Sequence, residues 1–309
     1  MHDRERKNGK AGWKHHGNSR KRKAGYYHEE HSMFLDIVLR SVRSPGARLG
    51  AAILLVMIAV CVLSPLIAPY GYNDMDLTAM FSAPSAKHLM GTDSLGRDIL
   101  SRLLYGGRYS LAIGFVTAFF AAFISIVFGC IAGYCGGKVE SVIMRIMDVW
   151  SALPSMLLCI LISTALGAGF FNTILALTIG QIPQGVRLMR GQILSERTKE
   201  YLEAASSINC SKIEIMFKHL LPNVISPMIV QLTMGIGNNI TLAAGLSYIG
   251  LGVQPPTPEW GAMLADGRAH ILNYPHLVIF PGLFIAFTVL AANLLGDGVR
   301  DALDPKLRQ

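Results

Sequence analysis

The sequence predicts an all-α membrane protein with six transmembrane helices and both termini in the cytoplasm. Three observations lead to this prediction. Only 16% of the 309 residues are charged, whereas soluble domains are nearer a quarter. Long stretches contain no Asp, Glu, Lys or Arg, and the cationic residues between these stretches favour one side of a membrane.

The charge-free stretches are residues 49–73, 109–137, 149–186, 219–258 and 269–296. A spanning helix needs roughly 20 apolar residues, and a charge at the bilayer centre costs about 2.5–3.5 kcal/mol, so each stretch can span at least once. The third is long enough for two helices, broken at Gly167-Ala168-Gly169 and Asn172. The fourth fits either two spans or one span and the start of a loop.

The positions of Lys and Arg decide between six spans and seven. With six, 23 of the 28 cationic residues lie on one side and five on the other, and without the N-terminal arm the split is 11 to five. A seventh span would place Arg300, Lys306 and Arg308 outside. Short cytoplasmic loops are enriched in Lys and Arg, so six spans are predicted.

This topology divides the chain into segments. Residues 1–48 are basic and poor in apolar residues, which predicts a disordered cytoplasmic arm and, without a folded reader, no nucleic-acid binding. The other segments are a first transmembrane helix (49–70), an external loop (71–107), a five-helix core (108–300) with a cytoplasmic loop at 190–222 and an external loop at 250–274, and a cytoplasmic tail (301–309).

Catalytic and metal sites are not expected. The five cysteines form an odd set without a CxxC pair, which is typical of buried thiols. The spans contain no HExxH motif or paired Asp, which disfavours a membrane enzyme. No Asp or Glu lies deep in a span, which disfavours a proton-driven transporter. A secondary transporter or channel remains the alternative from a different class.

The polar run from Glu203 to Pro222 reads as two short helices joined by a hinge. Asn209 tolerates the left-handed conformation that ends many helices, and Ser211 with Glu214 has the form of a capping box. Pro222 suits the start of the next span. Four apolar residues at helical spacing predict one apolar face: Ile213, Met216, Phe217 and Leu220. An amphipathic elbow of this kind, between two spans, predicts a docking surface.

This run resembles the EAA loop of permease subunits from bacterial ATP-binding-cassette importers. The resemblance implies that six residues couple the chain to an ATPase: Glu203, Ala204, Ala205, Asn209, Leu221 and Pro222. Asn209 stands where the family has Gly, which is a mild departure because Asn is the best other residue at positive φ.

A second resemblance is specific to one branch of these permeases. The segment His88–Gly106 resembles the GTDxxGRD segment that introduces the second span in the peptide/opine/nickel branch. Its motif residues are Gly91, Thr92, Asp93, Gly96, Arg97 and Asp98, and Asp98 is expected near a helix start, where the helix dipole favours an anion. The segments Gln254–Arg268 and Leu294–Pro305 resemble the C-type subunit of the same branch. Trp260 and the neighbouring prolines predict a rigid cap at the membrane interface.

Amide side chains along the middle spans have two interpretations. They bond neighbouring helices together, or they line a path for a polar substrate. The candidates for the path are Gln181, Gln231, Asn238 and Asn239. The adjacent pair Asn238-Asn239 is the best candidate, because two adjacent amides cannot both face one neighbour.

The resemblances imply a type I importer-like permease bundle in the bacterial cytoplasmic membrane. No GxxxxGK[ST] motif is present, so ATP and Mg²⁺ are expected on separate ATPases and no cofactor in this chain. The implied partners are a second, homologous permease subunit, two cassette ATPases, an extracytoplasmic solute-binding protein and lipid. The cargo is expected to be a di- or oligopeptide, with nickel, glutathione and opines as alternatives.

Overall fold

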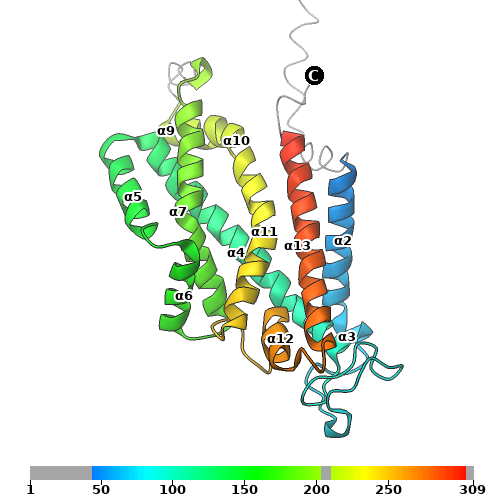
Figure 1. Cartoon of the computed structure of the whole chain (residues 1–309). Helices are drawn as coiled ribbons and strands as arrows, with labels where there is room; N and C mark the ends of the chain where they lie inside the picture. Colours follow the sequence, from blue (N-terminus) through cyan, green and yellow to red (C-terminus); the bar gives the residue numbers. More distant parts are fainter. Residues whose placement is uncertain (1–43, 203–209, 304–309) are drawn as a thin grey trace, which may run out of the picture.

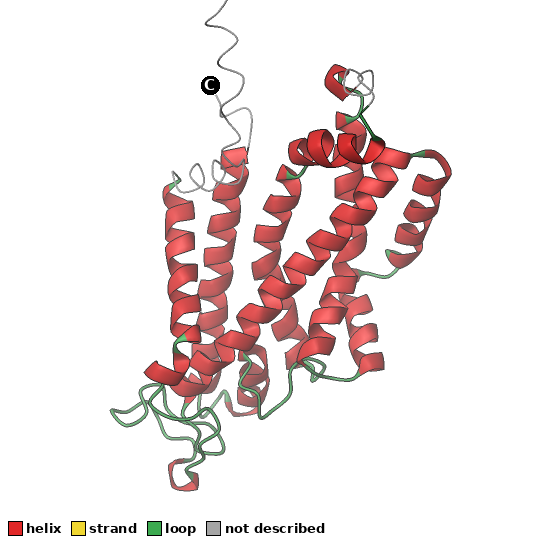
Figure 2. Cartoon of the chain, turned by 180° about the vertical axis from the view of Figure 1, so that it is seen from behind, coloured by secondary structure: helices red, strands yellow, loops and turns green. Residues whose placement is uncertain are grey.

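The computed structural model describes residues 44–202 and 210–303. Within these ranges every regular element is helical, apart from one isolated bridge between Thr92 and Asp98 (Figure 2). The predicted all-α class is therefore confirmed. The elements are α2 (Pro45–Val62), α3 (Ser64–Ile67), η1 (Leu77–Ala79), α4 (Ile99–Cys135), α5 (Gly137–Trp150), α6 (Ser155–Leu166), α7 (Phe170–Glu196), α9 (Lys212–Glu214), η2 (Ile215–Leu220), α10 (Leu221–Val224), α11 (Ser226–Tyr248), α12 (Trp260–Gly267), η3 (Arg268–His270) and α13 (His276–Leu303).

Three described helices, α2, α4 and α13, are long and apolar enough to cross a membrane. Two bent pairs raise the number to five if each counts as one span: α5 with α6, bent by 79°, and Ile215–Val224 with α11, bent by 56°. These counts rest on length and composition alone. Six spans and the cytoplasmic position of both termini stay predictions.

Several helices begin or end beyond the charge-free stretches. α2 begins at Pro45 and includes Arg48, and α4 begins at Ile99, inside the range expected for the external loop. α7 continues through Arg187 and Arg190 to Glu196. Arginine is a good helix former, so these cations do not end the helix. Both have partners on α5: Arg187 Nη2 lies 3.0 Å from Asp148 Oδ1, and Arg190 pairs with Glu140.

The break predicted inside the third stretch is confirmed. α6 ends at Leu166, and α7 begins at Phe170. Gly167 has φ +85°, a conformation that few other residues adopt. Asn172 Nδ2 donates to the carbonyl oxygens of Leu166 and Gly167, both at 3.0 Å, and thereby satisfies the end of α6.

α4 is the longest described helix, with 37 residues, and it crosses the bundle diagonally (Figure 1). It packs most extensively against α7. Glycines allow this approach: a Cβ on Gly129 would lie 2.5 Å from Met189 Cβ, and one on Gly133 would lie 2.6 Å from Ile193 Cβ. A side chain at either position would push the two helices apart.

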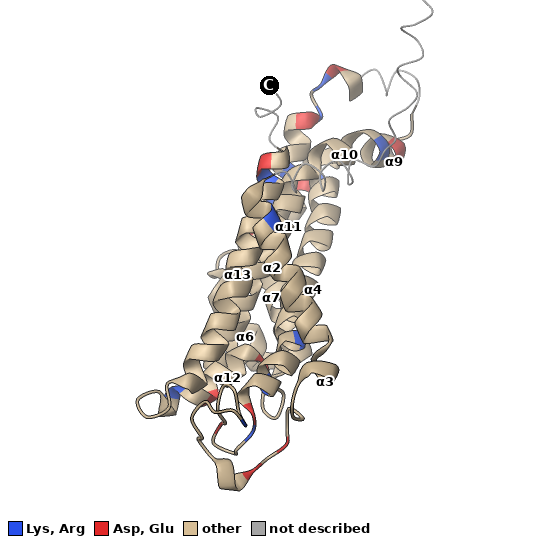
Figure 3. Cartoon of the chain, turned by 90° about the vertical axis from the view of Figure 1, so that its right-hand side faces the viewer, with Lys and Arg blue, Asp and Glu red and all other residues tan. Residues whose placement is uncertain are grey.

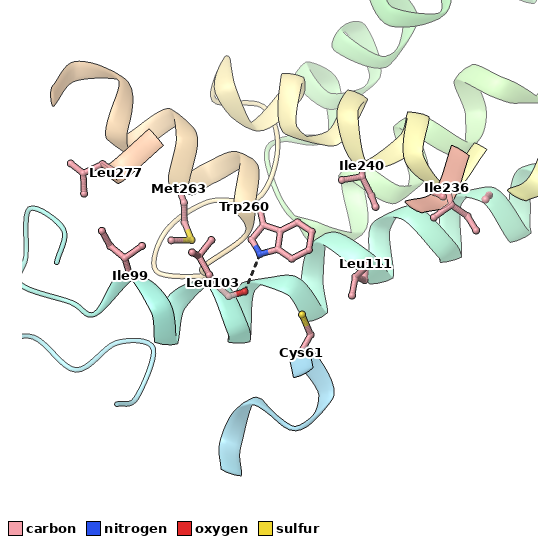
Figure 4. Packing of buried hydrophobic residues seen from close by; sticks show 11 residues of the cluster. Cys61, Ile99, Leu103, Leu111, Ile236, Ile240, Trp260, Met263 and Leu277 are labelled. Carbon is pink, nitrogen blue, oxygen red and sulfur yellow. Dashed lines mark hydrogen bonds between the residues drawn. The ribbon is translucent and has the colours of Figure 1, made fainter. Parts of the chain in front are cut away.

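Trp260 is the centre of a core at the α12 end of the bundle (Figure 4). Its side chain is fully buried, and its indole Nε1–H donates to Leu103 O at 2.9 Å. The sequence did not predict that the ring packs within the protein, and the position of this segment at the membrane interface stays a prediction. α12 packs inward against α4, α11 and α13, which supplies the apolar surroundings and the acceptor that a buried indole needs.

The described charged residues gather toward the two ends of the bundle, and its middle is free of them (Figure 3). One end carries α12 and the loop between α3 and α4, and it is called the α12 end here. The opposite end carries α9, η2 and α10, which together form the elbow, residues 210–225. This distribution suits a bundle whose middle lies in hydrocarbon.

Candidate functional site

The elbow begins with a helix start and ends in the membrane-length helix α11. Ser211 Oγ accepts from the backbone N–H of Glu214 at 3.2 Å, as the predicted capping box requires on one side. Pro222 lies in the first turn of the short helix α10, while Pro227 occupies that place in α11. The expectation that Pro222 begins the long helix is therefore wrong, because Pro222 lies in the short helix α10, which precedes α11.

The predicted apolar face of the elbow is wrong in part. Leu220 is fully buried, but Ile213 and Phe217 are 69% and 59% exposed. Ile215 turns inward in their place, because Ile215–Leu220 form a π-helical turn with a wider spacing than the α-helix. The elbow therefore packs on the bundle through one face and presents two large apolar side chains on another.

The packed face of the elbow lies against α7. Leu220 and Val224 belong to a buried cluster with Met189 and Ile193 of α7, and Leu221 packs against its edge. Leu221 and Pro222 are both half-buried. Four residues assigned to ATPase coupling lie outside the described residues: Glu203, Ala204, Ala205 and Asn209.

A groove of about 630 Å³ is lined by residues of α6, α7, α11 and α13. It is called the central groove here. Its polar lining consists of Ser155, Gln181, Gln184, Ser226, Gln231, Asn238 and Arg300. Arg300 is the one charged side chain among the described lining residues, and the expected path did not include it. The one sequence signal for Arg300 was its place at the end of the last apolar stretch, and the structure puts it in the last turn of α13.

The two adjacent asparagines face different surroundings, as the sequence suggested. Asn238 is exposed and lines the central groove. Asn239 is fully buried, accepts from Gln181 Nε2 at 2.6 Å and donates to Gly114 O at 3.4 Å. Asn239 thus joins α7, α11 and α4, and three of the four path candidates, Gln181, Gln231 and Asn238, line the groove.

The GTDxxGRD motif folds the loop before α4 onto the start of that helix. Asp98 is the N-cap of α4: its Oδ2 accepts from the backbone N–H and the hydroxyl of Ser101, both at 2.8 Å. Its Oδ1 lies 3.0 Å from His88 Nδ1. The predicted place of Asp98 at a helix start is confirmed, and the pairing with His88 was not foreseen.

The other motif residues serve the same loop. Asp93 Oδ2 accepts from Arg97 Nε at 2.7 Å, and Thr92 Oγ1 accepts from Ser82 N at 2.9 Å. Gly91 and Gly96 have φ +81° and +70°. A Cβ on Gly96 would lie 1.8 Å from Asp76 O, so only glycine fits there. The polar side chains of the motif bond to groups of the same loop and of the start of α4. The motif therefore has a structural role, which is to hold this loop against α4.

Glu259 is a buried carboxylate that sequence reasoning missed. It is 1% exposed and N-caps α12, where it accepts from the backbone N–H groups of Gly261 and Ala262. The hydroxyls of Ser110 and Ser247 donate to it as well, each at 2.9 Å. Four donors offset the cost of burying the charge, and they join α4, α11 and α12 at one point.

Asp266 lies near the motif on α12. Burial raises the pKa of its carboxyl group, against the opposing effect of Arg102 and Arg97, whose positive charges lower it. Both arginines also form ion pairs with Asp93.

No group of three or more His, Cys, Asp or Glu side chains suited to a metal ion was found among the described residues.

Comparison with known families gives two matches. Residues 125–309 match the family described as "Binding-protein-dependent transport system inner membrane component". Residues 32–84 match "N-terminal TM domain of oligopeptide transport permease C".

Individual relatives and one solved transporter agree with these matches. The chain is 43% identical over 263 residues to the "Probable D,D-dipeptide transport system permease protein DdpC" of Escherichia coli K12, covering 85% of this chain and 88% of that protein. It is 46% identical over 267 residues to the "Glutathione transport system permease protein GsiD" of Escherichia coli O157:H7, covering 86% and 88%. An inward-facing MetNI methionine ABC transporter chain has a similar fold, with TM-score 0.56 at 19% identity over 67% of this chain and 98% of that chain.

Proposed function

Because this chain belongs to the family of binding-protein-dependent transport system inner membrane components, we propose that it forms half of the path of an ATP-driven importer for di- or oligopeptides. It is a permease subunit of the ATP-binding-cassette type. In this proposal it spans the bacterial cytoplasmic membrane six times with the elbow in the cytoplasm, and it catalyses no covalent step.

The proposed assembly has four kinds of part. A second, homologous permease completes the path, and a solute-binding protein delivers the cargo to the α12 end. Two cassette ATPases hold ATP and Mg²⁺ and dock at the elbow. Exposed apolar surface favours protein contact, so the exposure of the large side chains of Ile213 and Phe217 on an elbow whose other face packs on α7 is the observation that carries the docking proposal.

The chemistry of the central groove supports a peptide as cargo. Its described lining offers amides, hydroxyls and the cation Arg300, and it contains no His, Asp or Glu. A short peptide presents N–H and C=O groups and a terminal carboxylate, which suit amide partners and a guanidinium. Nickel sites commonly use imidazole or other nitrogen and oxygen ligands. The names of the relatives, D,D-dipeptide and glutathione permeases, point to the same chemistry.

Coupling follows from the way in which the elbow is attached. ATP-driven closure of the ATPases moves the docked elbow, and its packed face transmits the movement to α7 through the cluster around Ile193. Glu203, Ala204, Ala205 and Asn209 supply the rest of the coupling loop, with Leu221 and Pro222 at its end. The groove then alternates between access from the α12 end and access from the elbow end.

The test is co-purification of the tagged chain from its membrane, with Glu203→Lys as the variant. We expect a cassette ATPase and a second permease to co-purify with the unmodified chain, and the variant to lose the ATPase at equal expression. Asp74→Lys, an exposed charge reversal in the loop between α3 and α4, is the matched control and keeps it.

The outcomes separate the alternatives. A chain that purifies alone or as a homo-oligomer contradicts the importer and favours a secondary transporter or channel. Uptake assays with labelled dipeptide, glutathione, an opine and nickel then decide the cargo. Import of nickel alone contradicts the peptide proposal while leaving the importer in place.

A further inference from the structure

The two ends of the coupling loop are joined to each other by side chains. Tyr201 lies five residues after α7 ends at Glu196, and Asn223 lies in α10, 22 residues after Tyr201. Asn223 Nδ2 donates to the Tyr201 hydroxyl oxygen at 3.2 Å, and the same hydroxyl donates to Glu196 Oε1 at 3.0 Å. The segment that follows α7 and the α10 end of the elbow therefore meet at one phenol.

The donor and acceptor roles at this phenol are consistent. A tyrosine hydroxyl donates one hydrogen bond and accepts others. Burial, together with the bond to Glu196, raises the pKa of Tyr201, so the hydroxyl keeps the proton that it donates. Asn223 Nδ2 also donates to His219 O at 2.7 Å, which fixes the amide relative to the turn before it.

Packing around this junction differs between its two sides. Leu202, beside Tyr201, and Val224, beside Asn223, are buried in the same cluster as Ile193. Tyr201 itself is 36% exposed, and exposed hydrogen bonds contribute little to folding. Burial of the leucine and valine therefore holds the elbow folded, and the hydrogen bonds fix the angle at which it leaves α7.

The end of α7 is attached to the rest of the bundle as well. Arg197 Nη1 donates to Gly133 O at the end of α4, at 3.1 Å, and Arg190 pairs with Glu140 of α5. A displacement of the elbow that reaches Glu196 therefore reaches α4 and α5. Without the junction at Tyr201, the elbow is attached to α7 through apolar contacts, which permit sliding because they have no fixed direction.

We propose that Tyr201 and Asn223 are positioning residues that close the base of the coupling loop, so that the elbow and α7 move as one body when the ATPases close. This inference rests on the proposed function. It assigns the two residues no contact with cargo or nucleotide. The cluster Glu196–Tyr201–Asn223 is called the clasp from here on.

The test compares Tyr201→Phe with Tyr70→Phe in the co-purified importer assembly, reconstituted in proteoliposomes with its binding protein. Both changes remove one phenol hydroxyl, since Tyr70 OH donates to Lys87 O at 3.1 Å at the α12 end. We expect Tyr201→Phe to keep its stability and its bound ATPase while import of a labelled dipeptide per ATP hydrolysed falls at least about fivefold, the lower end of typical coupling between sites. Tyr70→Phe keeps the unmodified ratio.

A double variant tests whether the two residues act together. Asn223→Leu is similar in size and removes the amide, so we expect it to lower the import per ATP as Tyr201→Phe does. Since both break one connection, the double variant falls no further than the lower single variant. Effects that multiply overturn the clasp, as does an unchanged ratio in Tyr201→Phe.

A direct measurement of motion separates positioning from stability. Spin labels on Lys218→Cys, an exposed position of the elbow, and Gly191→Cys on α7, where an added Cβ meets nothing within 4 Å, report the distance between the two elements in a background without the native cysteines. We expect one narrow distance distribution with and without ATP, and a broad one in Tyr201→Phe. A narrow distribution in Tyr201→Phe overturns the clasp alone. An unmodified assembly without ATP-dependent import, by contrast, overturns the proposed function itself.

Discussion

At the scale of single residues, Glu259 is the buried charge on which the α12 end depends. Its two oxygens accept from two serine hydroxyls and two backbone N–H groups. Ser110 makes two hydrogen bonds, because its Oγ donates to Glu259 and also accepts from Trp260 N at 3.1 Å. The carboxylate thus fixes where α12 begins and, through Ser110, where the indole ring of Trp260 lies.

Glu259→Gln is expected to lower the free energy of unfolding by about 2–3 kcal/mol, because the new NH₂ group faces donors that lose their acceptor. Thermal unfolding of the purified chain in detergent measures this. The matched control is Glu200→Gln at an exposed position, which leaves the unfolding temperature unchanged. Equal unfolding temperatures for the two variants would show that the carboxylate is not needed.

Residue-level reasoning from the sequence succeeded where local backbone chemistry decides. Asp98 was expected at a helix start because an acidic residue suits that position, and it is the N-cap of α4. For Trp260 it predicted a cap at the interface and did not foresee that the ring is buried in protein, since an indole in a proline-rich loop suits both surroundings. The packing of α12 against α4, which no local pattern records, buries the ring.

At the scale of elements, the contact between α4 and α7 depends on glycine. Gly133→Ala is expected to destabilise the chain by about 1–3 kcal/mol, because its Cβ would meet Ile193 Cβ in a packed interface. Gly191→Ala, on the open side of α7, is the matched control and is expected to be neutral or stabilising by up to about 1 kcal/mol. Unfolding measurements on both variants check this.

A second change tests the stated cause of the Gly133 effect. Combining Gly133→Ala with Ile193→Gly removes the Cβ that the new methyl group meets. We expect the double variant to lose less stability than the sum of the two single losses. Strictly additive losses would mean that α4 and α7 do not meet at this point.

The elbow shows why an amphipathic pattern predicts a helix better than it predicts the buried face. Ile213, Met216, Phe217 and Leu220 follow α-helical spacing, yet Ile213 and Phe217 are exposed while Ile215 is buried. The π-turn shifts the register, and the cluster on α7 selects which side chains enter it. Neither the π-turn nor the cluster on α7 can be predicted from the spacing of apolar residues in this segment.

At the scale of the whole molecule, the orientation in the membrane is the central prediction. Leu272 at the α12 end is 94% exposed, and the native Cys135, at the end of α4 nearer the elbow, is exposed as well. With the other four cysteines replaced by serine, we expect a membrane-impermeant maleimide to label Leu272→Cys in intact cells. We expect Cys135 to be labelled only after the membrane is opened. Labelling in the opposite order would invert the proposed topology.

The general plan of the bundle could be predicted because burial in lipid restricts composition strongly. Charge-free stretches located α2, α4, α11 and α13, and the glycines at 167 and 169 located the break before α7. The central groove could be predicted only in part. Gln181 and Asn238 were named for their polarity, but the separation of Asn238 from the buried Asn239 depends on how α11 is rotated about its own axis.

The length of α4 sets a condition on the lipid around this protein. At 1.5 Å per residue, its 37 residues extend about 55 Å, whereas bilayer hydrocarbon is about 30 Å thick. Even the charge-free part from residue 109 onward is about 40 Å long and fits that thickness only when tilted by roughly 40°, the upper end of the usual range. A thicker bilayer favours a more upright α4, and through the glycine contact with α7 that rotation reaches the groove. Hydrophobic mismatch is therefore a force on the same helix pair that carries the elbow.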